Sequence, residues 1–269
     1  MSKKYAVFID GDNISSAYLD VIMTEIVKEN DEILVKRIYG DWTTTNMNSW
    51  KEKLQDSPIR VFQQFRNGEN ATDNAIIMDA IELAIQNKDI DAYCIVSTDA
   101  DYYSLALRLR ENGKYVFGIG KENSKLIWQN SCNKFVKIEN ILKGEELAED
   151  DNTTRIEKVM EKSNIDDEDI VNKKSITLGK AKVLPSVEGN SLNIIFEYGL
   201  ANSKINTDGW ISLADFGNTI NARYPSFDPR TFGSKRLLPL VKLFEDNIEI
   251  KHDDWFPPNY YLRKKVFEE

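Results

Sequence analysis

The sequence predicts an α/β fold in its first half, with a parallel sheet covered by helices on both faces. Two observations lead to this prediction. Short apolar runs alternate with helical patterns from residue 5 to residue 140, and this alternation is typical of a parallel sheet built from βαβ units. The central runs are apolar at nearly every position, as expected for strands that are buried on both faces.

The elements of this half follow from periodicity and from start and stop signals. The first strand is expected at 5–9 (YAVFI), and an amphipathic helix at 14–28. Further strands are expected at 33–39, 59–65, 92–97, 115–120 and 134–139. Further helices are expected at 46–55, 72–86 and 102–111. Asn112-Gly113 is a stop signal for the last of these helices.

The remainder of the chain predicts a linker and a smaller C-terminal unit. Residues 144–182 are charged and polar with little apolar periodicity, which is typical of a segment without a core of its own. We therefore expect an α/β domain at 1–143, a linker at 144–182 and a second domain at 183–269. A length of 269 residues is compatible with two moderate domains.

Within the second domain, the pattern predicts helices followed by a hairpin. Helices are expected at 189–201, 213–223 and 238–245, the last with Pro239 in its first turn, where a missing N–H is harmless. Asp228-Pro229 predicts the start of a short further helix. Strands at 247–251 and 260–266 can pair across the sequence HDDWFPPN. Helices followed by such a hairpin predict a winged helix.

Composition excludes several function classes. One histidine excludes His-based triads and His-rich metal sites, and the two cysteines, Cys94 and Cys132, suggest no disulfide framework or zinc site. No apolar run approaches the roughly 20 residues that span a bilayer, and the first residues lack a secretory signal. We expect a cytoplasmic protein that does not associate with membranes.

The charge balance bears on nucleic acids. Acidic residues outnumber basic residues by 44 to 35, for a net charge of −9. This balance argues against a protein that holds nucleic acid by backbone charge alone. An enzyme that meets phosphates through bound metal ions is still compatible with it.

Acidic residues gather where elements begin and end. Asp10 and Asp12 follow the strand at 5–9, Asp99 and Asp101 follow the strand at 92–97, and Asp73 opens the helix at 72–86. Ligands of parallel α/β sheets bind outside the carboxyl ends of the strands. No Lys or Arg interrupts FIDGDN, NATDNA or VSTDAD, so converging carboxylates would need a cation to stay charged. Oxygen ligands favour Mg²⁺ or Mn²⁺, which suits phosphodiester hydrolysis.

Each of these acids has a simpler interpretation as a helix cap, because Asp, Asn and Thr are preferred at N-caps. The alternatives are Asp12 or Asn13 for the helix at 14–28, Thr72 or Asp73 for the helix at 72–86, and Thr98 or Asp99 for the helix at 102–111. Asp79 lies about 240° around the helix from Asp73, so we expect it to be a structural acid or a support for the site.

The Asp-x-Asp pattern after the first strand is also found in phosphatases of the haloacid dehalogenase type, where the first Asp is the nucleophile. Such an enzyme needs a separate Lys and a Ser/Thr at another strand end. This sequence does not clearly place either of them.

Residues 5–140 resemble the NYN domain family of PIN-like nucleases, in particular its LabA-like branch. The matching stretches are VFIDGDNI, IYGDW, NATDNAIIMDAIELA, CIVSTDADYYSLALRLRENGKYVFGIG and SCNKFVKIE. The resemblance implies a PIN-like sheet and Mg²⁺- or Mn²⁺-dependent cleavage of RNA. It implies that the metal is held by Asp10, Asp73, Asp99 and Asp101, and that Asn13 helps to orient the site. Glu69, where Lys is common, and Tyr102, where Phe is usual, depart from the family pattern.

Residues of about 183–267 resemble the OST-HTH/LOTUS module through the run GWISLADFGNTINARYPSFDPRTFGSKRLLPLVKLFEDNIEI. The resemblance implies binding of RNA or of a protein partner. In this run basic residues lie among aromatic residues, a pattern that suits binding of single-stranded RNA. The basic residues are Arg223, Arg230, Lys235 and Arg236. The aromatics could equally be core residues and the basic residues a solvated face. The segment DDWFPPNYYLRKKV offers a second such surface, or an edge strand protected by Lys.

Together these observations predict a metal-dependent ribonuclease with a C-terminal module for RNA or partner binding. The alternative is an RNA-binding or scaffold protein that retains the acidic pocket without turnover. The sequence leaves the oligomeric state open.

Overall fold

The computed structural model describes residues 2–28, 31–65, 70–145 and 186–265, with the side chains of 186–191 left out of the description. Nearly all of the predicted linker at 144–182 lies outside these residues, as does Glu69. The described chain divides into two units, an α/β unit and a C-terminal unit, and each is described by itself.

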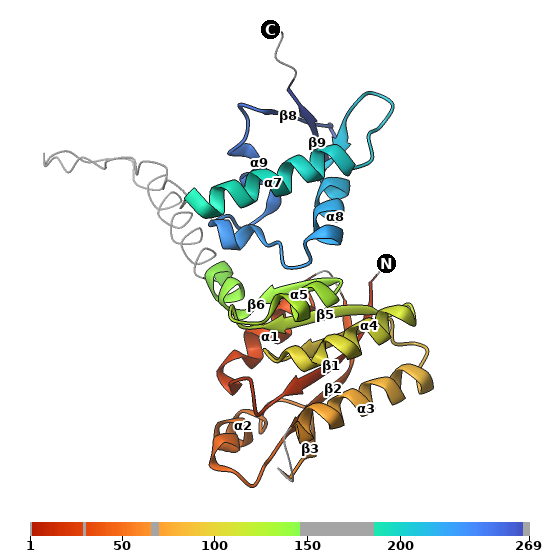
Figure 1. The fold of residues 1–269 in the computed structure, drawn as a ribbon, viewed down its shortest axis with the longest axis vertical. Helices are drawn as coiled ribbons and strands as arrows, with labels where there is room; N and C mark the ends of the chain where they lie inside the picture. The colour runs from red at the N-terminus through yellow and green to blue at the C-terminus, as the bar shows by residue number, and fades with distance from the viewer. Residues whose placement is uncertain (1, 29–30, 66–69, 146–185, 266–269) are drawn as a thin grey trace, which may run out of the picture. The chain divides into compact units, whose positions relative to one another are not determined.

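The α/β unit is built on one six-stranded parallel sheet in the order β3-β2-β1-β4-β5-β6 (Figure 1). The strands are β1 (Lys4–Asp10), β2 (Glu32–Gly40), β3 (Arg60–Gln63), β4 (Ala92–Val96), β5 (Tyr115–Gly120) and β6 (Lys134–Lys137). All six predicted strands are present. β6 ends before the predicted residue 139, because residues 138–145 are helical. Ile138 and Ile141 are buried in the core, and their spacing is that of a helix rather than of a strand.

Helices cover both faces of this sheet, as predicted from the apolar strands. They are η1 (Ser16–Tyr18), α1 (Leu19–Ile26), η2 (Thr45–Met47), α2 (Asn48–Lys53), α3 (Ala71–Gln86), η3 (Ala100–Tyr102), α4 (Tyr103–Glu111) and α5 (Leu126–Ser131). One core contains Val7 and Ile9 of β1 together with residues of α1 and α2. The other contains Ala6 and Phe8 together with residues of α3, α4 and α5. Figure 1 shows α3 and α4 running across the sheet.

Helix α5 was not predicted from the sequence. It has only six residues, too few to show helical periodicity. Its Trp128 is fully buried, and the indole Nε1 donates a hydrogen bond to the carbonyl of Ser97 at 3.0 Å. Tertiary packing therefore stabilises a helix whose local sequence gives little signal.

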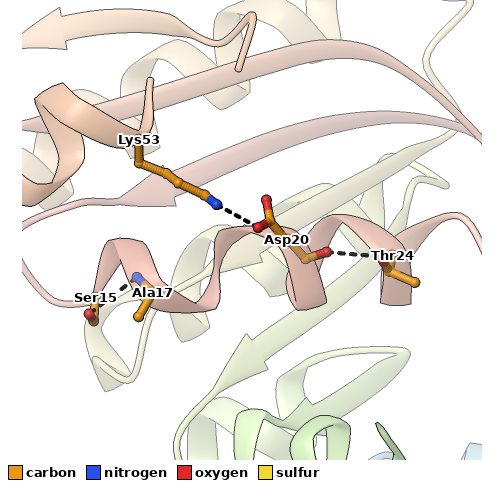
Figure 2. A network of polar contacts seen from close by, with 5 residues as sticks. All are labelled: Ser15, Ala17, Asp20, Thr24 and Lys53. Carbon is orange, nitrogen blue, oxygen red and sulfur yellow. Dashed lines mark hydrogen bonds and ion pairs between the residues drawn. The ribbon is translucent and has the colours of Figure 1, made fainter. Parts of the chain in front are cut away.

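The first helical segment is capped by Ser15, and not by Asp12 or Asn13. The Ser15 hydroxyl accepts a hydrogen bond from the backbone N–H of Ala17 at 3.4 Å (Figure 2). The same view shows Asp20 paired with Lys53 of α2 at 2.5 Å, and Thr24 donating to the Asp20 carbonyl at 2.9 Å. Because Ser15 serves as the cap, Asp12 and Asn13 are available for contacts at the end of the sheet.

The strand order puts β1 and β4 side by side at the centre of the sheet. The chain builds outward from β1 through β2 to β3, and then outward on the other side from β4 through β5 to β6. Neighbouring crossovers leave in opposite directions at such a switch point, which opens a crevice at the carboxyl ends of the two strands. Asp10 ends β1 and Asp99 follows β4, so both lie at this crevice.

The C-terminal unit has a winged-helix-like fold. Its elements are α7 (Ser186–Asn202), β7 (Ile211–Ser212), α8 (Leu213–Arg223), η4 (Pro229–Phe232), α9 (Leu237–Lys242), β8 (Ile248–His252) and β9 (Tyr260–Lys264). Strands β8 and β9 form the predicted antiparallel hairpin, and Pro239 lies in the first turn of α9 as expected. The two-residue strand β7, which was not predicted, extends the sheet to the order β7-β9-β8.

Among the described residues, no helix is both long enough and apolar enough to cross a bilayer.

Candidate metal centre

Three carboxylates from two separate segments meet at the crevice. Asp73, Asp99 and Asp101 each offer one oxygen, and these oxygens all lie within 4.8 Å of one another. Asp73 is in the first turn of α3, whereas Asp99 and Asp101 belong to the 3-10 turn that follows β4. The Asp99 side chain also accepts from the backbone N–H of Asp101 at 3.1 Å. The predicted cap at Asp99 is therefore present, and it coexists with the cluster.

Asp10, the fourth predicted ligand, lies beside these three acids and is more deeply buried. Its carboxylate is 4% exposed and accepts from Ser97 Oγ at 3.0 Å and from the Asn13 backbone N–H at 3.2 Å. Burial, followed by the charges of Asp73 and Asp12, raises the pKa of Asp10 to about 7, against the lowering effect of the hydrogen bonds from Ser97 and Tyr102. The oxygens of Asp10 are not among the three that converge.

Tyr102 connects Asp10 to the cluster. Its hydroxyl lies 2.6 Å from Asp73 Oδ1 and 3.3 Å from Asp10 Oδ2. The side chain is fully buried, and a phenol has one proton to donate. The shorter distance indicates that this proton goes to Asp73. The sequence identified Tyr102 only as a departure from a family pattern, although its position directly after Asp101 was a usable signal.

The cluster carries excess negative charge. Burial raises the pKa of Asp73, and the charges of Asp99, Asp101 and Asp12 raise it further, against the lowering effect of the Tyr102 hydrogen bond. Within the part of the chain that the structure describes, no Lys or Arg forms an ion pair with Asp10, Asp73, Asp99 or Asp101. A divalent cation would offset this repulsion, and an all-carboxylate set fits Mg²⁺ or Mn²⁺ better than zinc.

Asn13 holds two strand ends together. Its backbone N–H donates to Asp10, and its side-chain Oδ1 accepts from the Thr98 backbone N–H at 3.0 Å. The exposed Asn13 side chain therefore links the segment after β1 to the segment after β4. It does not contact the three converging carboxylates through any hydrogen bond that the described residues form.

Asp12 joins the same region from the side of α3. It accepts from Thr72 Oγ1 at 2.8 Å and from the Asp41 backbone N–H at 3.3 Å. The Thr72 hydroxyl thus binds Asp12 across the sheet end, and the N-cap position of α3 is Asn70, with a φ of 62°. The cap interpretations of Thr72 and Asp73 are therefore wrong.

Asp79 has a structural role in α3. Its carboxylate pairs with Arg37 Nη1 at 2.6 Å and accepts a hydrogen bond from the Tyr39 hydroxyl, both from β2. These contacts attach α3 to the sheet at a point away from the cluster. The expectation that Asp79 and Asp73 point in different directions is confirmed.

The layer behind the cluster is tightly packed. Ser97 donates to Asp10, and its Oγ accepts from the Asp99 backbone N–H at 3.1 Å. A Cβ built on Gly120 would lie 2.7 Å from the Ser97 carbonyl oxygen and 3.0 Å from the Phe135 ring. The role of Ser97 was not predicted from the sequence, because it depends on contacts between strands.

The predicted RNA-binding residues of the C-terminal unit differ in exposure. Arg223 and Arg236 are exposed and Lys235 is half-buried, whereas Arg230 is only 9% exposed. Arg230 is therefore not the surface cation that the sequence analysis expected, because it lies in η4 with its side chain covered. Phe227 and Phe232 are half-buried, which favours the interpretation that these aromatics pack within the fold.

Comparisons with known proteins find two domains. A family model described as the NYN domain matches residues 4–139, and one described as the OST-HTH/LOTUS domain matches residues 196–255. No curated protein matches the chain.

Solved structures are more distantly similar. A crystal structure of a protein of unknown function from Vibrio parahaemolyticus is 21% identical, with a TM-score of 0.42, over 51% of this chain and 93% of that one. An NMR structure of an uncharacterized protein from Nitrosomonas europaea is 24% identical, with a TM-score of 0.26, over 39% of this chain and 96% of that one.

Proposed function

The chain belongs to the NYN domain family and has an OST-HTH/LOTUS domain after it, and from this premise we propose that it is a metal-dependent ribonuclease. NYN domains are typically nucleases and LOTUS domains bind RNA. The observation that carries the proposal is the meeting of the Asp73, Asp99 and Asp101 oxygens within 4.8 Å. The LabA-like branch and the domain boundaries at 1–143 and 183–269 stay predictions.

The residues that would hold Mg²⁺ or Mn²⁺ are Asp73, Asp99 and Asp101, with Asp10 beside them. Such an ion, when bound, lowers the pKa of water and stabilises charge on a phosphoryl oxygen. Without a metal, burial and the neighbouring acids raise the pKa of Asp10 to about 7, and a cation bound beside Asp10 would favour its charged form. We therefore assign to Asp10 a role beside the metal.

Two further residues would position this site. Tyr102 holds Asp73 through the 2.6 Å hydrogen bond. Asn13 ties the end of β1 to the segment after β4, which keeps Asp10 and Asp99 at a fixed separation. In this proposal Asn13 orients the site by connecting its two halves.

The C-terminal unit would hold RNA for the α/β unit. Exposed Arg223 and Arg236, with half-buried Lys235, are the cations of the predicted RNA-binding segment that the structure leaves accessible. Arg230 is not part of this proposal. A protein partner of this unit and a cytoplasmic location belong to the same set of predictions.

The net charge of −9 favours a second candidate function, that of an RNA-binding or scaffold protein without turnover. An RNA-binding or scaffold protein with the same pocket would not need rapid access of polyanionic substrate to the acidic cluster. It would bind RNA or a partner without cutting RNA under any metal condition.

Cleavage of a labelled single-stranded RNA by the purified full chain separates the two candidates. We expect cleavage with Mn²⁺ or Mg²⁺, none with EDTA, and a loss of at least 100-fold in rate for Asp99→Asn, since one ligand of the charged cluster is removed. The matched control is Asp89→Asn, an exposed acid between the end of α3 and the start of β4, at the opposite edge of the sheet from the cluster. Cleavage that persists in Asp99→Asn or in EDTA would contradict the proposal, and RNA binding without cleavage would favour the second candidate.

A further inference from the structure

The C-terminal sheet has one buried face and one open face. In the hairpin register Ile250 pairs with Leu262, while Lys251 pairs with Tyr261 and Glu249 with Arg263. Leu262 is fully buried in the core of the unit. Because side chains alternate across a strand, the two other pairs share the opposite face. That face is polar and aromatic, and it turns away from the core of the unit.

Trp210 extends the open face on the far side of β9. It precedes β7, in which Ile211 pairs with Leu262, so Trp210 lies on the same face as Arg263. The Lys251 Nζ is 4.4 Å from the centre of the Trp210 ring, and the Arg263 guanidinium carbon is 4.5 Å from it. Cation–π contacts of this kind hold flexible basic side chains in place at a surface.

The turn between β8 and β9 exposes two large aromatic side chains. Trp255 is 76% exposed and Phe256 is 99% exposed. The turn itself is ordered by Asp253, which accepts from the Asn259 backbone N–H at 2.8 Å, from Asn259 Nδ2 at 2.7 Å and from the Trp255 backbone N–H at 3.3 Å. The hydrogen bonds to Asp253 therefore order the turn that carries the two exposed rings.

The turn and the open face are continuous. The Tyr261 hydroxyl reaches Asp253 Oδ2 at 3.4 Å, and Lys251 Nζ also lies 5.8 Å from the Tyr261 ring centre. The continuous surface, which we call the wing surface, consists of Trp210, Lys251, Trp255, Phe256, Tyr261 and Arg263. Figure 1 shows the β8–β9 hairpin that carries most of it.

We propose that the wing surface binds single-stranded RNA. The inference rests on the RNA-holding role proposed above for the C-terminal unit, to which it adds a specific surface besides Arg223, Arg236 and Lys235. Exposed Trp255 and Phe256 offer faces on which unpaired bases stack, and exposed Lys251 offers charge for the phosphates between them. Among the acids of the hairpin, Asp253 is used within the turn, Glu249 pairs with Arg263 at 2.5 Å, and Asp254 is exposed.

The alternative interpretation of this segment, an edge strand protected by Lys, accounts for fewer of these features. The edge strands of the sheet are β7 and β8, since the order is β7-β9-β8. Tyr261 and Arg263 belong to the central strand β9, and Trp255 and Phe256 to the turn. Lys264 of this segment lies on the central strand β9, and protection of an edge does not explain exposed rings on the turn or two cations at one indole.

The test is binding of a fluorescein-labelled, unstructured 20-nucleotide RNA of mixed sequence to the full chain, measured by fluorescence anisotropy in EDTA so that cleavage does not interfere. The double variant Trp255→Ala/Phe256→Ala should bind at least tenfold more weakly, because base stacking on each ring is lost. The control variant Leu243→Ala removes another exposed apolar side chain, 66% exposed in the same unit, and should bind like the wild type.

A second variant addresses the cations. Lys251→Gln should weaken binding and reduce the salt dependence of the affinity, because one phosphate contact is removed. Affinity within twofold of the wild type for both variants would overturn the inference. So would a wild-type chain that binds no RNA, and the wing surface would then suit a protein partner.

A cleavage assay on the same proteins separates this inference from the proposed function. If the wild type cleaves RNA but the wing variants bind it normally, the inference fails and the ribonuclease proposal stands. If the wild type cleaves no RNA but the wing variants lose RNA binding, the inference stands and the ribonuclease proposal fails.

Discussion

The hydroxyl of Tyr102 lies 2.6 Å from a carboxylate oxygen of Asp73. This contact joins the turn after β4 to the first turn of α3, the two segments that supply the converging carboxylates. Tyr102 also lies 3.3 Å from Asp10 at the end of β1. One buried phenol therefore touches acids from both other segments of the candidate site.

Replacing Tyr102 by Phe should weaken metal binding while the fold is kept. The variant removes only the hydroxyl, so Asp73 loses the hydrogen bond that lowers its pKa, and a hydrogen bond to a charged group is worth about 1.5–3 kcal/mol. We expect a Kd for Mn²⁺ that is raised roughly tenfold in calorimetric titration at pH 7.5. The neighbouring Tyr103→Phe, at a ring 38% exposed, is the matched control. Equal affinities of the two variants would show that the Tyr102 hydroxyl does not position Asp73.

Stability without metal should fall as pH rises from about 4 to about 7. Asp10 has an ordinary pKa of 3.8 and a pKa of about 7 in the folded protein. Between these values the folded chain holds a proton that the unfolded chain has lost, so stability decreases with pH across this window. The raised pKa of Asp73 acts in the same direction.

Thermal unfolding in EDTA between pH 4.5 and 8 measures this effect. Asp10→Asn should flatten the curve, because the variant has no carboxyl group to ionise, and it should be more stable than the wild type above pH 7. Asp89→Asn should follow the wild type. Parallel curves for the wild type and Asp10→Asn would mean that the Asp10 carboxyl does not titrate in this window.

Asp79→Asn should reduce stability without affecting metal binding. The substitution removes the charge that pairs with Arg37, whose side chain is 15% exposed, and leaves a partly buried guanidinium without its partner. We expect a loss of about 1–3 kcal/mol in the free energy of unfolding by urea denaturation. Calorimetric titration should give the wild-type Kd for Mn²⁺. A large loss of Mn²⁺ affinity would place Asp79 in the metal centre, contrary to its position in the structure.

Gly120→Ala should disturb the candidate metal centre through Ser97, which holds Asp10. The new Cβ would lie 2.6 Å from Ser124 Oγ and 2.7 Å from the Ser97 carbonyl oxygen, and the backbone carbonyl has little room for adjustment. We expect a loss of about 1–3 kcal/mol in the free energy of unfolding and a weaker affinity for Mn²⁺, because Ser97 holds Asp10. Gly113→Ala is not a suitable control, since Gly113 has a φ of +72°. A better one is Ala201→Gly at an exposed position of α7, which lowers stability through helix propensity and should leave the Kd for Mn²⁺ unchanged.

Much of the fold was predictable from local patterns. Apolar runs such as residues 92–97 gave all six strands because buried parallel strands need an apolar side chain at almost every position. The positions of Asp10, Asp99 and Asp101 at the crevice were predictable, since acids at the ends of such strands lie at the carboxyl edge of the sheet. The sequence does not contain the strand order, but the alternation of elements restricts it.

Other features depend on contacts between distant residues. The sequence offers two equal interpretations of Asp12, as a cap or as a site residue, and only the Ser15 contact to Ala17 decides against the cap. The bridge made by Tyr102 spans 29 residues to Asp73 and 92 residues to Asp10. The burial of Arg230 likewise follows from tertiary packing, because its local sequence resembles that of its exposed neighbours.

The central claim is that the carboxylates at the ends of β1 and β4 and at the start of α3 hold a divalent cation. The most direct test is the anomalous diffraction signal of Mn²⁺ in crystals of the full chain grown with saturating MnCl₂ near pH 7.5. The account predicts a Mn²⁺ ion bound by oxygens of Asp73, Asp99 and Asp101, at the metal–oxygen distances of about 2.0–2.3 Å typical of hard cations. A map with no anomalous peak among these three side chains at saturating Mn²⁺ would contradict it.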